Sequence, residues 1–209
     1  VSVPLAQEGT GQVVVDFTPE PLTQDVSFVF HIEKTADVVV DSLTAEISGI
    51  PSTMELTTGL ILAQKTYKLL FRPTYAALPS AADSASAETL RCEASVNIPG
   101  IVRSHTEDMV TGPGILQIAI YTHYDYEEEG TQRKAAKVFH AGINLYHTLK
   151  ERKSLQWDEE ENGYRQASRS ITVEIGSPLN IDKDGILNGG STSTGLDQWI
   201  PGETFEIEV

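Results

Sequence analysis

The stretch VSFVFHIE, residues 26–33, decides the fold that the sequence predicts. Apolar and polar side chains alternate along it: the apolar ones are Phe28, Phe30 and Ile32, and the polar ones are Ser27, His31 and Glu33. This two-residue period is typical of a β-strand with one buried and one wet face. VVVDF (13–17) lies upstream and SLTAEISGIPSTMELTTG (42–59) downstream, and neither shows a helical period. This part of the chain therefore predicts a sheet with an apolar face.

Further strand-like runs follow along the whole chain. The predicted strands are residues 12–17, 26–33, 42–48, 67–71, 90–98, 116–124, 137–145, 171–175 and 205–209. Proline and glycine between these runs remove hydrogen-bond donors or permit positive φ, which ends strands. Residues 116–145 predict a long hairpin, and residues 145–155 predict a helix because apolar residues recur there at helical spacing. We therefore expect an all-β fold with at most one short helix.

The chain is long enough for one large domain or two small ones, and we expect residues 1–209 to form a single β-sandwich domain. A chain of 209 residues buries enough apolar surface to form a core without disulfides. Cys92 is the only cysteine, which excludes an internal disulfide and predicts a small buried apolar residue. Residues 76–88, AALPSAADSASAE, predict a flexible surface loop. Because the sequence begins at Val1 and not at Met, we expect it to be part of a longer precursor.

The charge of the chain restricts its partners. The formal net charge is −15 and the sequence pI is about 4.6. Nucleic acids bind through clusters of Lys and Arg, so we expect no nucleic-acid partner. No apolar run approaches the ~20 residues that a membrane-spanning helix needs. We therefore expect a soluble domain that does not itself span a membrane.

One segment shares features with a calcium-binding loop. Asp182, Asp184 and Asn188 place oxygen ligands around Gly185, as at the start of such a loop. A complete loop needs an acidic residue about eight positions after the glycine, and Ser193 stands there. A plain Asp-Gly turn is therefore the preferred interpretation, and we expect no bound metal.

Histidines and aromatic residues are the other candidates for a catalytic or a ligand-binding site. His123 and Asp125 share a strand face, but the sequence has no GxSxG motif and places no serine for a triad. We therefore expect no catalytic residues and no enzymatic activity. Trp157 and Trp199, together with several tyrosines, could stack on the apolar faces of sugar rings. Aromatic residues at strand spacing are more often packing residues of the core or of neighbouring strands, so packing is the preferred interpretation.

The order of the segments resembles one protein family. The segments that carry it are VVVDFTPEPL (13–22), VSFVFHIEK (26–34), SLTAEISGIPSTMELTTG (42–59), ITVEIGSPLNI (171–181), and Trp199 followed five residues later by FEIEV (205–209). Together they resemble the C-terminal domain of fimbrillin-like pilus and surface lipoproteins of the Bacteroides group. The resemblance implies a Greek-key β-sandwich of the transthyretin-like or immunoglobulin-like kind, exported as a lipoprotein and displayed on the outer membrane or in a pilus.

From this resemblance we expect a non-catalytic adhesion or pilus subunit without a cofactor. It would assemble with other pilus subunits or surface proteins through strand edges. In the last strand Phe205, Ile207 and Val209 would share one face, so the strand would either complete its own sandwich or be exchanged into a neighbouring subunit. The alternative function is an extracellular carbohydrate-binding module, in which Trp157 and Trp199 would contact a glycan.

Overall fold

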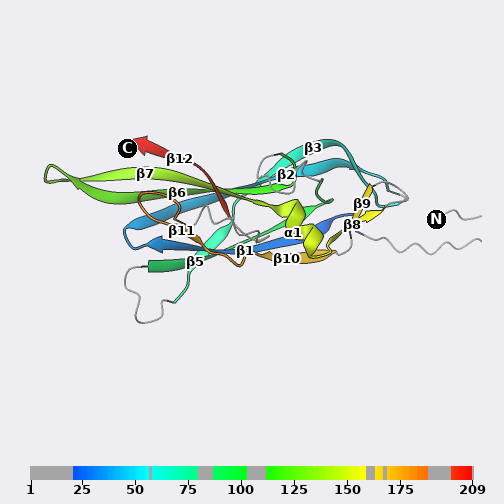
Figure 1. The fold of residues 1–209 in the computed structure, drawn as a ribbon, viewed down its shortest axis with the longest axis horizontal. Helices are drawn as coiled ribbons and strands as arrows, with labels where there is room; N and C mark the ends of the chain where they lie inside the picture. Colours follow the sequence, from blue (N-terminus) through cyan, green and yellow to red (C-terminus); the bar gives the residue numbers. More distant parts are fainter. Residues whose placement is uncertain are drawn as a thin grey trace, which may run out of the picture.

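The computed structural model shows an all-β protein built from two sheets and one short helix (Figure 1). It describes residues 21–56, 58–79, 87–102, 112–158, 163–166, 169–187 and 199–208, and among these the side chains of all but 62–64, 156–158, 163–166 and 207–208. The predicted all-β sandwich is confirmed. Its Greek-key connectivity stays a prediction.

The smaller sheet, which we call sheet A, is built around β1. Its order is β10-β1-β5-β4, and β11 also pairs with β1. The strands are β1 (Gln24–Thr35), β4 (Thr74–Ala77), β5 (Ala87–Ile98), β10 (Ser170–Glu174) and β11 (Leu179–Ile181). β10 and β11 run parallel to β1, whereas β5 runs antiparallel to it over its whole length.

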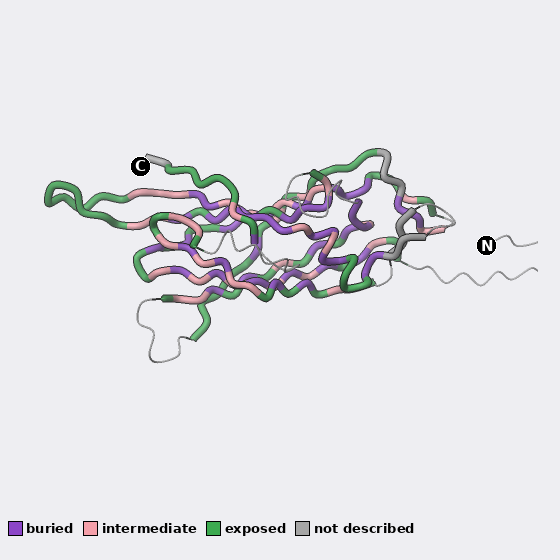
Figure 2. The backbone as a smooth tube through the Cα atoms, viewed as in Figure 1, coloured by how far each residue is buried: buried purple, intermediate pink, exposed green. Residues whose placement is uncertain are grey.

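The larger sheet, sheet B, has the order β12-β7-β6-β2-β3-β9-β8. Its strands are β2 (Val38–Met54), β3 (Ile61–Phe71), β6 (Ile115–Glu128), β7 (Thr131–Asn144), β8 (Leu155–Asp158), β9 (Gly163–Gln166) and β12 (Ile200–Glu208). All of its neighbours pair antiparallel. β6 and β7 form the predicted long hairpin, whose exposed tip projects beyond the rest of the sandwich (Figure 2).

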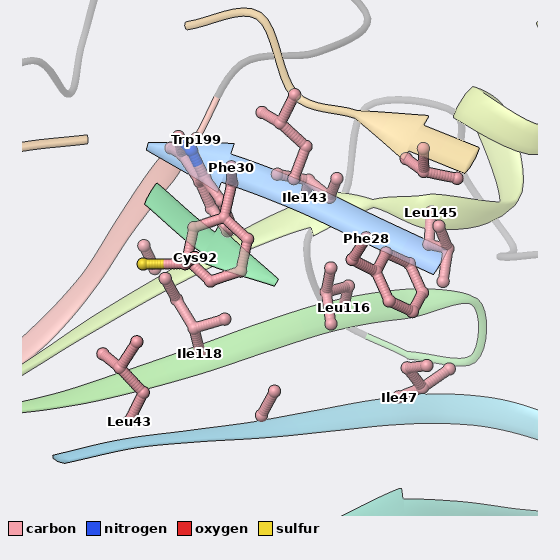
Figure 3. Packing of buried hydrophobic residues seen from close by; sticks show 14 of the residues in the cluster. Phe28, Phe30, Leu43, Ile47, Cys92, Leu116, Ile118, Ile143, Leu145 and Trp199 are labelled. Atoms are coloured by element: carbon pink, nitrogen blue, oxygen red, sulfur yellow. The ribbon is translucent and has the colours of Figure 1, made fainter. Parts of the chain in front are cut away.

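The core lies between the two sheets (Figure 3). Phe28, Phe30 and Ile32 of β1 are buried, as their alternation predicts, and they face residues such as Ile47 and Ile118 of sheet B. Burying one such side chain contributes roughly 1.5–3 kcal/mol. The sandwich is therefore held mainly by the inward rows of its strands.

The helix is shorter than predicted. α1 spans Leu145–Glu151, and the side chain of Asn144 caps it by accepting a hydrogen bond from the amide of His147 at 3.0 Å. Lys153 has a φ of 55°, which no helix accommodates, so the predicted end at residue 155 is wrong and Leu155 begins β8. Among the described residues no helix is long and apolar enough to cross a bilayer.

Several strand boundaries also differ from prediction. The short strands β4, β8, β9 and β11 were not expected. The predicted loop 76–88 is strand at both ends, since β4 ends at Ala77 and β5 begins at Ala87; residues 80–86 lie outside the described part. All four residues of β4 are exposed, so it is held by pairing with β5 and carries no burial pattern. The predicted strand 12–17 also lies outside the described residues.

Gly49 is a point where the backbone permits no side chain. It lies in β2 at a shift in register, and its φ is 78°. A Cβ atom on Gly49 would lie 2.4 Å from the amide nitrogen of Gly114, at the entry to β6. The same region is closed by hydrogen bonds from the Gly114 amide to the Ser48 carbonyl and from the Val102 amide to the Gly49 carbonyl.

We predict that Gly49→Ala lowers the free energy of unfolding by about 3 kcal/mol or more, because the energetic cost of a positive φ and the cost of the backbone clash add. Gly59→Ala is the matched control: its φ is 72°, but its Cβ would meet no atom within 4 Å. That variant should lose only about 1 kcal/mol. Denaturant unfolding of the two variants measures the difference, and equal losses would contradict the clash.

Candidate interaction site at the edge strand β12

The C-terminal strand lies at the edge of its own sheet (Figure 1). β12 pairs antiparallel with β7, from Thr204 opposite Phe139 to Glu208 opposite Ala135. A bulge separates this stretch from Pro201, which lies opposite Ala141. The structure thus places Phe205 and Ile207 in an edge strand, whereas Val209 lies outside the described residues.

Phe205 points away from the core. It lies opposite Val138, whose neighbour Phe139 faces inward, and its side chain is 50% exposed. Its ring meets the imidazole of His140 edge-on, with centroids 5.6 Å apart. The ring of Phe205 is therefore turned outward and does not close the sandwich, whereas the side chains of Ile207 and Val209 lie outside the described residues.

Phe205 belongs to an apolar surface that we call the outer patch: Tyr121, Val138, His140 and Phe205. Antiparallel pairing puts Tyr121, Val138 and Phe205 in one row across β6, β7 and β12. Tyr121 and Phe205 are exposed, whereas Val138 is buried. The sequence analysis did not identify this patch, and the alternation of exposed Tyr121 with buried Ile120 was the signal available.

The opposite face of β12 is polar. Glu206 lies opposite Lys137, with its carboxylate 3.9 Å from the ammonium group, and it accepts a hydrogen bond from the Tyr124 hydroxyl at 3.4 Å. The Lys137 ammonium also donates to the Lys183 carbonyl at 2.6 Å and lies 5.4 Å from the centre of the Tyr124 ring. Because Glu206 is 63% exposed, its ion pair contributes at most about 1 kcal/mol. The ion pair therefore links β12 to β7 at one register position and adds little to the free energy of unfolding.

The acids of β12 act against pairing with an identical strand. Glu203, Glu206 and Glu208 lie along this edge strand, and Pro201 and the bulge interrupt its first half. Charged side chains, proline and bulges are the means by which edge strands avoid joining copies of themselves. Like charges placed opposite each other in a ladder destabilise it. The edge therefore favours an unlike strand over a second copy of β12.

Trp199 lies in the core, in line with the packing interpretation that we preferred, and does not offer its ring to a glycan. Its side chain is 4% exposed, and its ring meets Phe30 edge-on at 5.4 Å, as Figure 3 shows. Its indole nitrogen finds no acceptor within the described part of the chain. Successive residues of an extended chain face opposite sides. Ile200 faces outward at the start of β12, so Trp199 before it faces inward. The side chain of Trp157 lies outside the described residues.

The segment with calcium-loop features forms a turn. Asp182 uses one carboxylate oxygen to accept hydrogen bonds from the amides of Asp184 and Gly185, at 2.7 and 2.8 Å. This is the Asp-Gly turn that we preferred, and Asn188 lies outside the described residues. Across the residues that the structure describes, no group of three or more His, Cys, Asp and Glu could hold a metal ion.

His123 has a different partner from the one that its sequence position suggests. Its imidazole nitrogen Nδ1 lies 2.8 Å from the carboxylate of Asp41, which sits at a shift in register of β2. Asp125 instead lies opposite Lys134 in the projecting hairpin. The pair His123 and Asp41 is partly exposed and joins the neighbouring strands β6 and β2.

Cys92 is fully buried in the core, in the middle of β5. Desolvation by burial raises the pKa of its thiol from 9.0 to about 12. The thiolate is the nucleophile in cysteine chemistry, and a rise of about three pKa units lowers the thiolate fraction roughly a thousandfold. Cys92 is therefore a packing residue.

We predict that a disulfide reagent such as DTNB does not modify native Cys92 at pH 8 on the scale of hours. The same thiol should react within minutes once guanidinium unfolds the chain. The Cys92→Ala/Glu93→Cys variant, which moves the thiol one position to the exposed face of β5, is the control and should react rapidly while folded. Rapid labelling of native Cys92 would show that the core opens there.

Comparisons of this chain with protein-family models, with curated proteins and with solved structures found no match. The fimbrillin-like resemblance therefore stays an expectation from the sequence.

Proposed function

We propose that this chain is a non-catalytic cell-surface adhesion or pilus subunit, or an accessory fimbrillin-like lipoprotein, that assembles through β-strand edges. The observation that carries the proposal is the position of β12: it is an edge strand whose Phe205 is half exposed beside the outer patch. An edge strand offers backbone donors and acceptors, and an adjacent apolar patch adds burial when a partner strand docks.

In this mechanism a strand of another protein pairs with the free side of β12. Its side chains on one face cover Phe205 and extend the row of Tyr121 and Val138. Its side chains on the other face meet Glu206, so the partner should alternate apolar with basic residues. The partners are other pilus subunits or surface proteins, and the site of action is the outer surface of the cell after export.

The carbohydrate-binding alternative receives less support. Of its two tryptophans, Trp199 is committed to Phe30 in the core. The exposed tyrosines lie with apolar and charged neighbours that suit a protein partner equally well, as at Tyr126, which lies opposite Arg133. We therefore propose assembly through strand edges, and not carbohydrate binding, as the function of this chain.

We predict that Phe205→Glu removes the chain from surface polymers without unfolding it. A charge at this position adds a fourth acid to β12 and prevents burial of the patch. The measurement is the amount of chain in high-mass fibres sheared from the cells that express it, expected to fall at least about tenfold, which corresponds to about 1.4 kcal/mol. The melting temperature should change little because Phe205 lies outside the core.

Leu56→Glu is the matched control. Leu56 is 76% exposed in the connection between β2 and β3, away from β12, and its variant should assemble normally. Wild-type assembly of Phe205→Glu would contradict the role of the outer patch. Absence of the wild-type chain from any surface polymer would contradict the proposed function itself.

A further inference from the structure

β10 is the outer strand of sheet A, and its composition favours pairing with a further strand. It pairs in parallel with β1, and no other strand of the described part of the chain pairs with it. Its residues SITVE (170–174) are rich in β-branched side chains, which suit a strand. Proline, lysine and bulges protect many edge strands from joining other strands. β10 contains no proline or lysine, and its register against β1 has no bulge.

The hydrogen bonds to β1 show which backbone groups of β10 face the free side. The Ile175 amide donates to the Val29 carbonyl at 2.9 Å, and at the other end of the strand the Arg169 carbonyl accepts a bond from β1. Every second residue of a strand directs its backbone groups to the same side. The amides and carbonyls of Thr172 and Glu174 therefore point away from β1.

The guanidinium group of Arg152 occupies the carbonyls on this free side. Its Nη1 donates to the Thr172 carbonyl at 3.2 Å, and its Nη2 donates to the Glu174 carbonyl at 2.8 Å. Hydrogen bonds from an ionised donor are stronger than those between neutral groups, and the planar guanidinium fixes the direction of both. One side chain thus covers two successive acceptors of an edge strand whose residues Thr172 and Glu174 are themselves exposed.

The end of α1 determines where Arg152 lies. Arg152 is the C-cap residue of α1, and its amide donates to the Thr148 carbonyl at 3.1 Å. Leu149, in the last turn of the helix, is fully buried, and its carbonyl accepts a bond from the Ser154 amide at 2.9 Å. Figure 1 shows α1 next to β10, although α1 connects two strands of sheet B. A helix anchored in the core therefore holds the guanidinium at the edge of sheet A.

We propose that β10 is a second pairing edge, suited to another copy of this chain, and that Arg152 blocks it. In an antiparallel pair of two β10 strands centred on Thr172, the amide and carbonyl of each Thr172 bond to those of the other copy. Ser170 then lies opposite Glu174, so no like charges face each other, in contrast to the acids of β12. The pair needs the carbonyls that Arg152 occupies, so it forms only after the guanidinium leaves. This surface lies in sheet A, and the inference goes beyond the proposed function.

Sedimentation velocity of the purified full chain across a dilution series tests the proposal. Arg152→Ala should dimerise with a dissociation constant at least about tenfold lower than that of the wild type. Arg133→Ala is the matched control, because it removes the same positive charge from a partly exposed arginine in the hairpin of β6 and β7. That variant should associate no more tightly than the wild type.

A second substitution locates the dimer. The Thr172 amide faces the free side, so Thr172→Pro removes a donor that the other copy needs and none that pairs with β1. The Arg152→Ala/Thr172→Pro variant should therefore return to the dissociation constant of the wild type. Arg152→Ala/Phe205→Glu should keep the dimer, because β12 belongs to sheet B. This last variant separates the inference from the proposed function, which depends on Phe205.

Three results of these measurements would overturn the proposal: a monomeric Arg152→Ala chain, a dimer that survives Thr172→Pro, and a dimer that disappears with Phe205→Glu. DTNB checks the fold of every variant, because Cys92 is fully buried and should stay unreactive. Rapid labelling of Cys92 in Arg152→Ala would show that the guanidinium holds the core closed. That result would also overturn its role as a block on β10.

Discussion

Two aromatic contacts that cross the sandwich organise this protein. Phe28 of β1 stacks on Phe71 at the end of β3, and Phe30 meets Trp199 just before β12. Both contacts join sheet A to sheet B, since β1 belongs to the first and β3 and β12 to the second. Aromatic pairs of this kind add about 0.5–1.5 kcal/mol to the burial of their surfaces. Neighbouring inward residues of one strand therefore determine where two distant parts of the chain are held.

These contacts also determine what the edges of the sheets can do. Because Trp199 is anchored on Phe30, the following strand starts at a fixed place and β12 lies along β7 with Phe205 outward. Phe71 packs on Phe28 at the end of β3, just before the chain enters β4 in sheet A. The contact of Trp199 with Phe30 lies at the start of the exposed edge that we assign to assembly.

The inward faces could be predicted from the sequence, and the edges could not. Alternation at Phe28, Phe30 and Ile32 is a local signal, and burial follows it directly. β4 has no such signal, because its exposed residues are strand only through pairing with β5. The partner of Trp199 could not be predicted for a related reason: an isolated tryptophan has no periodicity, and only the distant Phe30 shows where its ring packs.

The outer patch could not be predicted from the sequence either. Tyr121 and Val138 lie in strands that are apolar on both faces near their middle, so alternation does not reveal which face meets the core. The register of β7 against β6 and β12 resolves this, because it puts Val138 in a row with Phe205 while Phe139 faces inward. Register is a property of paired strands, and a single strand in the sequence does not contain it.

Electrostatics restricts which strands can pair with β12. A net charge of −15 and the acids of β12 oppose the approach of an identical subunit at that edge, and this repulsion acts within a Debye length of about 8 Å. The partner strand that we propose carries basic residues, so the same charges that oppose self-association favour an unlike partner.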